Sequence, residues 1–218
     1  MWDHLRGLLA YEIANGGQVS IINRLDRETS GLTLIAKTRD AARLFSGLMQ
    51  QRQIEKEYLA LVNGWPADDR FDVDQPILRQ GDVQSSRIYL KQMVHPSGGA
   101  AFTSFEVLER REWEDRRISL VRAHPHTGRM HQIRVHLAWS GHYVLGDKIY
   151  GPDEAHYLRF IETGWTDALA KELLLPRHAL HSARMKINSQ GHDWRSPLSE
   201  DLQAWLGLHF EAAIRKGE

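Results

Sequence analysis

The chain has 218 residues, with 28 Lys plus Arg, 28 Asp plus Glu and no cysteine. This length suits one domain with a substantial core, and the lack of cysteine excludes disulfides and thiolate metal sites. The first residues do not resemble a secretory signal, and no apolar run approaches the ~20 residues that span a bilayer. We therefore expect a soluble, cytoplasmic protein.

The formal net charge is zero, which is not the overall signature of a nucleic-acid-binding protein. The charges are unevenly distributed, however. Seven arginines lie between residues 110 and 134, against three acidic residues, whereas residues 68–82 hold five aspartates against two arginines. Such blocks could bind RNA on one face of the protein, or they could simply be solvated surface, and charge alone does not decide between these readings.

Apolar spacing and turn residues predict the secondary structure. In chain order, the predicted elements are a helix over residues 5–15, strands over 19–23 and 32–37, a helix over 38–53, a strand over 56–62, a loop over 65–82, strands over 86–93, 101–108 and 117–123, a helix over 130–140, helical patches over 152–176, a strand over 179–187 and a helix over 199–214. This order predicts an α+β fold with a mixed, largely antiparallel β-sheet flanked by helices, in one domain over residues 1–218.

Residues 22–37 contain the first candidate for chemistry. Arg24 and Asp26 stand two positions apart at the end of an apolar run, and a Thr-Ser-Gly turn and a second apolar run follow. Two strands joined by this short turn would hold both side chains at a sheet edge, facing the same way. An ionised carboxylate beside a guanidinium can act as a nucleophile, although a lone aspartate near a strand end is more often a cap or a surface charge.

The second candidate is the segment 124–136, which holds four histidines and leads into a predicted helix. The first turns of this helix present Arg129, His131, Gln132 and Arg134. A helix start can bind an anion, and arginine binds phosphate or carboxylate through its planar fork. The histidine spacings match no zinc motif, so anion recognition is favoured over the alternative of a histidine-liganded metal hydrolase.

Four segments together resemble the RluA-type pseudouridine synthases. Residues 22–37 are similar to the catalytic motif of that family, which usually reads His-Arg-Leu-Asp followed by Thr-Ser-Gly. The other three segments, in the same order as in the family, are the tyrosine-bearing strand at 56–64, the second long motif at 127–151 and the late Leu-His-Ala-x-Arg-Leu strand at 179–185. The resemblance covers roughly residues 20 to 187.

This resemblance implies an enzyme that isomerises uridine to pseudouridine in a structured rRNA or tRNA stem-loop, without cofactor or metal. It implies three catalytic residues: the carboxylate of Asp26, Tyr58 packed against the flipped uracil, and Arg134 paired with the aspartate. The residues expected to bind RNA are Arg24, which would take the place of the displaced base, and Arg27, Arg129, His131, Gln132 and Lys148.

The resemblance also bears on the organisation of the chain. The usual first strand of the family has no match here, and we expect no RNA-binding module of the S4 type before the catalytic region. We expect a monomeric catalytic domain with no membrane partner. The alternative is a non-catalytic RNA-binding or RNA-folding protein that retains the fold.

Overall fold

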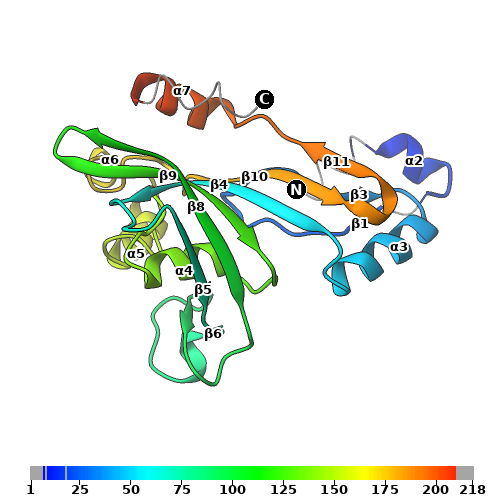
Figure 1. Cartoon of the computed structure of the whole chain (residues 1–218), viewed down its shortest axis with the longest axis horizontal. Helices are drawn as coiled ribbons and strands as arrows, with labels where there is room; N and C mark the ends of the chain where they lie inside the picture. The colour runs from blue at the N-terminus through cyan, green and yellow to red at the C-terminus, as the bar shows by residue number, and fades with distance from the viewer. Residues whose placement is uncertain (1–6, 8, 18, 210–218) are drawn as a thin grey trace.

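The computed structural model describes residues 7, 9–17 and 19–209, and its centre is one large β-sheet (Figure 1). The main path of this sheet has the strand order β11-β10-β4-β9-β8-β5, and every pairing along it is antiparallel. The bounds are β4 Glu55–Asn63, β5 Arg70–Asp74, β8 Phe102–Trp113, β9 Arg116–Pro125, β10 Leu180–Ile187 and β11 His192–Arg195. The predicted α+β fold with a largely antiparallel sheet is confirmed.

Five shorter strands lie around this sheet. β1 (Ser20–Ile21) pairs with β3 (Ile35–Ala36) in an antiparallel ribbon, and β6 (Ile77–Arg79) pairs with β7 (Gln92–Val94) in another. β2 (Ser30–Gly31) adds to β10 in parallel. The predicted strands at 19–23 and 32–37 therefore exist, but each forms only two residues of ladder. The chain between them crosses to the large sheet instead of turning back directly.

Helices gather at both ends of the sheet (Figure 1). The helical elements are α2 Ala10–Ala14, α3 Arg39–Gln50, α4 Gln132–Trp139, α5 Ala155–Thr163, α6 Asp167–Leu173 and α7 Glu200–His209, with 3₁₀ turns η1 Gln80–Asp82 and η2 Asn188–Gln190. The Thr38 hydroxyl caps α3 by accepting the Ala41 N–H. The outer parts of the helices predicted over 5–15 and 199–214 fall outside the described residues.

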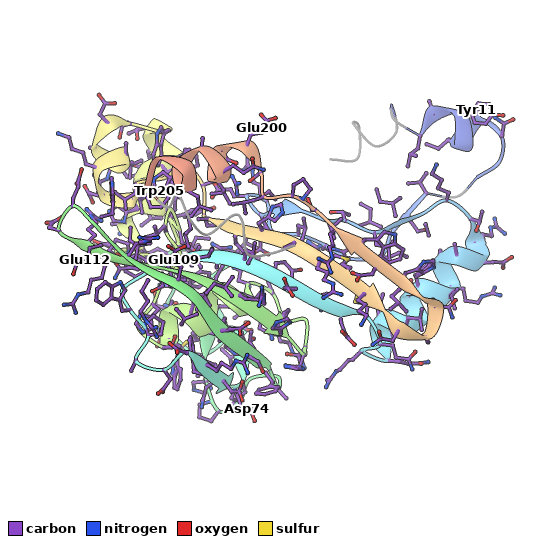
Figure 2. All side chains as sticks on the ribbon, turned by 45° about the horizontal axis from the view of Figure 1, so that its top comes forward. Tyr11, Asp74, Glu109, Glu112, Glu200 and Trp205 are labelled. Atoms are coloured by element: carbon purple, nitrogen blue, oxygen red, sulfur yellow. The ribbon has the colours of Figure 1, made fainter. Side chains whose placement is uncertain are left out.

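The main core forms where β4 passes through the middle of the sheet. Ala60, Leu61 and Val62 are all buried, because neighbouring strands and packed helices cover both faces of the strand. α7 belongs to this core, and its Trp205 (Figure 2) meets Trp113 edge to face, with ring centroids 5.6 Å apart. Within the described ranges, no helix is long and apolar enough to cross a bilayer.

Two sequence predictions were wrong. Residues 65–82 were predicted as loop, but they contain β5 and β6. Their signal in the sequence is weak, because β5 is a five-residue edge strand with only two apolar residues and β6 has only three residues. Residues 86–93 were predicted as a strand, but only Gln92 and Met93 are in one. Ser86 instead bonds to the backbone of Ile88, and this local turn replaces a ladder partner.

Candidate active site

The loop that carries Asp26 is tied across its own base. Asn23 is buried between the two sides of the loop, and it accepts the Leu34 N–H at 2.6 Å and donates to the Leu32 carbonyl at 3.3 Å. Beyond Asp26 the chain turns at once, since the Thr29 N–H donates to the Asp26 carbonyl at 3.0 Å. These bonds fix the backbone on which the carboxylate stands.

Gly31 lets the end of this loop dock on the large sheet. Its φ is +103°, and a Cβ atom at this position would lie 2.2 Å from the Ser182 carbonyl oxygen of β10. Only glycine combines that backbone conformation with so close an approach. The glycine of the predicted Thr-Ser-Gly turn therefore anchors the Asp26 loop to β10.

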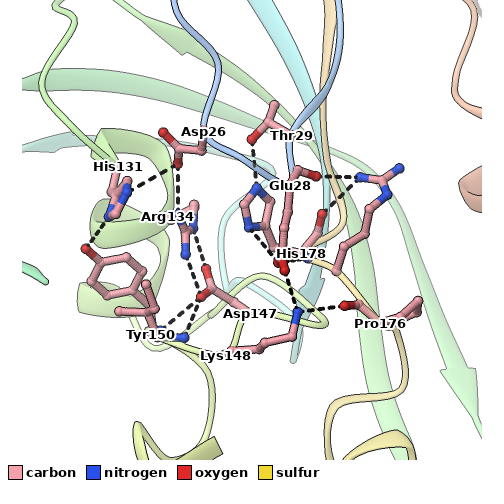
Figure 3. Close-up of polar contacts among 12 residues, drawn as sticks. Asp26, Glu28, Thr29, His131, Arg134, Asp147, Lys148, Tyr150, Pro176 and His178 are labelled. Carbon is pink, nitrogen blue, oxygen red and sulfur yellow. Dashed lines mark hydrogen bonds and ion pairs between the residues drawn. The ribbon is translucent and has the colours of Figure 1, made fainter. Parts of the chain in front are cut away.

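Arg134 joins Asp26 to a second carboxylate (Figure 3). Its Nη1 donates to Asp26 Oδ2 at 2.8 Å, while Nε and Nη2 donate to the two oxygens of Asp147 at 2.6 and 2.9 Å. The Arg134 side chain is 5% exposed and Asp147 is fully buried, whereas Asp26 keeps 25% of its side-chain surface. Asp147 thus holds the guanidinium on its buried side through Nε and Nη2. The remaining nitrogen, Nη1, donates to Asp26, which is the more exposed of the two carboxylates.

The pKa shifts of this pair follow from competing causes. Burial would lower the pKa of Arg134, but the charges of Asp147 and Asp26 outweigh it and raise that pKa overall. Burial would raise the pKa of Asp147, but Arg134 and the backbone N–H of Tyr150 lower it strongly. Both groups therefore stay charged throughout the physiological range, and the position of Arg134 depends on Asp147.

His131 stands beside Asp26 as a neutral group. Burial and the charge of Arg134 lower its pKa to about 4, although its Nε2 is only 4.0 Å from Asp26 Oδ2. The Tyr150 hydroxyl accepts the Gln92 backbone N–H and shares a hydrogen bond of 2.7 Å with His131 Nδ1. Because the imidazole is neutral, its close contact with Asp26 is not an ion pair.

Behind the loop, Lys148 is neutralised by the protein. Its side chain is 3% exposed, and its ammonium donates to Glu28 Oε1 at 2.7 Å and to the Pro176 carbonyl at 2.6 Å (Figure 3). The ammonium also lies over the ring of Phe160. His178, whose pKa burial holds well below its usual value, bonds to the Thr29 hydroxyl at 2.7 Å. We call Glu28, Arg134, Asp147, Lys148 and His178 the buried network.

On the open side of the loop lies a cleft of about 850 Å³, which Asp26 and Tyr58 both line. Tyr58 is buried in β4 between Ala123 of β9 and Ser182 of β10. Burial and the nearby charge of Asp26 raise its pKa, so its hydroxyl is protonated at neutral pH. The cleft therefore brings a carboxylate and a phenol together.

The charge of the cleft differs from that of the whole chain. Five lining residues are basic and two are acidic, and three histidines join them. The charged lining residues are Arg24, Arg52, Lys56, Arg129, Arg134, Asp26 and Glu55. A positive field in a concave site attracts anions. The zero net charge of the chain therefore hides a site that suits a polyanion.

The residues expected to bind RNA fall into two groups. Arg24 and Arg129 are exposed along the cleft, His131 lies at its floor, and Arg27 is exposed but does not line it. Gln132 and Lys148 are buried, and their polar atoms are already bonded. Gln132 accepts from the Thr127 hydroxyl and the Arg129 N–H and donates to the Phe102 carbonyl, so it shapes the loop before α4. These two side chains support the site from within the protein.

The arginines between residues 110 and 134 do not form one RNA-binding face. Arg110 and Arg111 lie near the β8–β9 turn and pair with Asp69 and Glu109; Figure 2 shows Glu109 and Glu112 on this hairpin. Arg122 pairs with Glu57 and Glu106 within the sheet. Only Arg129 and Arg134 of this set line the cleft. The other arginines fit the second interpretation of this charge block, a solvated surface, better than an RNA-binding face.

The four histidines of residues 124–136 have separate environments. His126 stacks on Phe102, His131 bonds to Tyr150, and His136 is buried between the Thr103 hydroxyl and the Gln75 carbonyl. Across the described part of the chain, no three His, Cys, Asp or Glu side chains gather in a way that could hold a metal ion. The geometry gives no support to a histidine-liganded metal hydrolase.

Sequence reasoning missed two important groups. Asp147 lies inside the second long motif at 127–151, but the sequence analysis gave it no role. Its contact with Arg134 joins residues 13 apart in the chain. Lys56 lies two positions before Tyr58 and lines the same cleft. Period-two alternation along the predicted strand could have found Lys56, because it places residues 56 and 58 on one face.

Fold and site together define an α+β protein with a carboxylate-centred cleft suited to an anionic substrate. The chain belongs to the RNA pseudouridylate synthase family, which it matches over residues 2–139. It is 34% identical over 201 residues to ribosomal large subunit pseudouridine synthase D of Nitrosomonas europaea, covering 90% of this chain and 53% of that protein. It is 35% identical over 193 residues to synthase C of Vibrio parahaemolyticus, covering 86% and 54%.

A solved structure agrees with this assignment. Human RNA Pseudouridylate Synthase Domain Containing 1 superposes with a TM-score of 0.67 at 26% identity, covering 88% of this chain and 73% of that one. The RluA-type resemblance is thereby confirmed. The chain spans little more than half the length of the bacterial relatives described above.

Proposed function

We propose that this chain converts specific uridines of a structured RNA, in rRNA or tRNA, to pseudouridine, with Asp26 as the catalytic carboxylate. The observation that carries the proposal is the Asp26–Arg134–Asp147 arrangement at the edge of a positively charged cleft. Membership of the synthase family supports the reaction type, and two relatives named for the ribosomal large subunit favour rRNA. We expect the enzyme to act in the cytoplasm.

The reaction breaks the N1–C1′ bond, turns the uracil and joins C5 to C1′. The proton at C5 is lost and N1 gains one, so the change is an isomerisation. Two routes start from the carboxylate of Asp26: it attacks C1′ to give an ester, or it removes a sugar proton to give a glycal. In both, the Arg134 guanidinium holds the carboxylate in one orientation, which lowers the cost of reaching the reactive geometry.

The target base must leave its stack to reach Asp26, as in other base-modifying enzymes. In the proposed complex Tyr58 packs against the flipped uracil at the floor of the cleft. Arg24, exposed two residues before Asp26, fills the vacated position, and Arg27 and Arg129 contact the backbone. His131 contributes as a neutral hydrogen-bond donor, whereas Gln132 and Lys148 act through the loops they support.

The test uses RNA from cells that lack this protein. The purified chain is incubated with that RNA, and pseudouridines are mapped by sequencing against untreated RNA. We expect new pseudouridines at defined positions, and we expect an Asp26→Asn variant to form none while binding the same RNA. Full activity of Asp26→Asn would exclude the carboxylate mechanism. Unmodified RNA that is nonetheless bound tightly, together with an unchanged cellular effect of Asp26→Asn, would favour the non-catalytic RNA-binding alternative.

A further inference from the structure

Lys56 extends from the strand that carries Tyr58. Both residues belong to β4, and side chains two positions apart in a strand point to the same face, about 6.6 Å apart along the chain. Both line the cleft that holds Asp26. If Tyr58 packs against the target base, Lys56 lies about one nucleotide step away along the floor of the cleft.

The charge of Lys56 has no partner among the residues that the structure describes. Among the described residues, its ammonium makes no hydrogen bond or ion pair, whereas the ammonium groups of Lys91 and Lys148 each meet a carboxylate. Burial lowers its pKa. A partly desolvated cation without a partner costs free energy, and an anion bound in the cleft would recover it.

The surroundings of Lys56 define where that anion would lie. The loop that precedes α4 approaches Lys56 at Gly128, where an added Cβ atom would be 3.8 Å from Lys56 Nζ. The next residue, Arg129, is exposed and also lines the cleft. An anion at Lys56 would therefore sit between β4 and this loop, with a second cation close by along the chain.

We propose that Lys56 binds a phosphodiester group of the substrate strand directly beside the target nucleotide. The phosphodiester is the anion that an RNA strand carries at every step, and its distance from the base matches the spacing of Lys56 from Tyr58. The inference rests on the proposed function for the identity of the strand. Lys56 is then a binding residue that fixes the sugar of the target uridine relative to Asp26.

The first experiment changes the RNA. A synthetic hairpin containing a mapped target uridine is prepared with a neutral methylphosphonate at one backbone position at a time, and its affinity is measured for wild type, Lys56→Met and Lys56→Arg. At one position beside the target we expect the neutral group to weaken binding about ten-fold for wild type and Lys56→Arg, but less than two-fold for Lys56→Met. Equal losses for all three proteins at every position would overturn the proposal.

The second experiment does not depend on catalysis. Binding of a short oligouridine strand is measured as a function of salt for wild type, Lys56→Met and the matched control Lys171→Met, an exposed lysine on α6. Loss of one phosphate contact should reduce the slope of log affinity against log salt by about 0.7 for Lys56→Met alone. Identical slopes for Lys56→Met and wild type would contradict the inference, as would an equal reduction for Lys171→Met.

The two proposals fail differently. If wild type forms no pseudouridine in any RNA, the proposed function is wrong, and the salt slopes still report whether Lys56 meets phosphate. If wild type is active and its methylphosphonate profile matches that of Lys56→Met, only the phosphate site is wrong. Thermal unfolding of each variant identifies any loss of affinity that comes from loss of fold, and the chemical change in the RNA leaves the protein untouched.

Discussion

The two sides of the Asp26 loop differ in whether their charged side chains have partners within the protein. On the inner side, the buried network matches Arg134 with Asp147 and Lys148 with Glu28. On the open side, Arg24, Lys56 and Arg129 face the cleft, and two of these three are exposed. Asp26 itself belongs to both sides, since Arg134 holds it from within while a quarter of its side chain remains accessible.

The difference separates support from recognition. A buried charge must find its partner inside the protein, because no water reaches it. A charge in an open cleft can be solvated by water until a bound ligand supplies the opposite charge. Lys148 and Lys56 show this most clearly: both lie near the site, but Lys148 is bound by Glu28 and Pro176, whereas the Lys56 ammonium makes no hydrogen bond or ion pair with the residues that the structure describes.

The largest effect should come from breaking the buried side. Replacing Asp147 by asparagine leaves the fully desolvated Arg134 without its bidentate partner, and one partner removed from a buried pair costs about 3–5 kcal/mol. We therefore expect the free energy of unfolding of Asp147→Asn to fall by about that amount in urea titrations. The matched control is Asp193→Asn in the Arg184–Asp193 pair at the surface, where the loss should be far smaller. Equal losses in the two variants would mean that burial does not distinguish the pairs.

A second effect concerns the anchor between the two sides. Gly31→Ala places a methyl group against the Ser182 carbonyl at a φ that only glycine adopts without strain, so we expect a loss of about 2–4 kcal/mol. Gly47→Ala in α3 is the control, because nothing lies within 4 Å and alanine favours a helix by about 1 kcal/mol. Pseudouridine formation should fall with Gly31→Ala even where the protein remains folded. A variant with unchanged stability and activity would show that β2 need not dock on β10.

Local sequence patterns predicted most of the strands of the large sheet but not the long-range contacts of the site. The apolar runs of β4, β8, β9 and β10 predicted those strands, since a buried strand needs little besides its own side chains to be recognised. β5 was missed because it is short and rich in aspartate, and it forms a strand through its pairing with β8, which its own sequence does not show. No spacing rule joins Asp26 to Arg134, 108 residues later, so that pair came from family resemblance alone. Whether a side chain is exposed also depends on residues far away in the chain. The expectation that Lys148 binds RNA was made without knowing that this lysine is buried.

Acid should weaken the protein through its buried neutral histidines. The pKa of His131 is about 4 in the folded chain and about 6.5 when unfolded, so the unfolded state binds more protons between these values. Its contribution to stability is complete above pH 6.5 and is lost as the pH falls towards 4, by about 3 kcal/mol in all. Urea titrations from pH 7 to pH 4.5 should show a smaller loss for His131→Gln than for wild type. His126→Gln, which changes an exposed imidazole, should follow wild type; a wild-type slope in His131→Gln would contradict the lowered pKa.

The smallest expected effect is the sharpest test of the comparison. Lys148→Met removes a positive charge close to the site, but one that Glu28 already neutralises within the protein. Its affinity for oligouridine should therefore stay within about two-fold of wild type, with an unchanged salt slope, while Lys56→Met loses one phosphate contact in the same assay. Stability should fall for Lys148→Met, because the Glu28 carboxylate and the Pro176 carbonyl lose their shared donor. If Lys148→Met instead lowered the salt slope, the inner lysine would reach RNA, and the division between a supporting and a recognising side of the Asp26 loop would not hold.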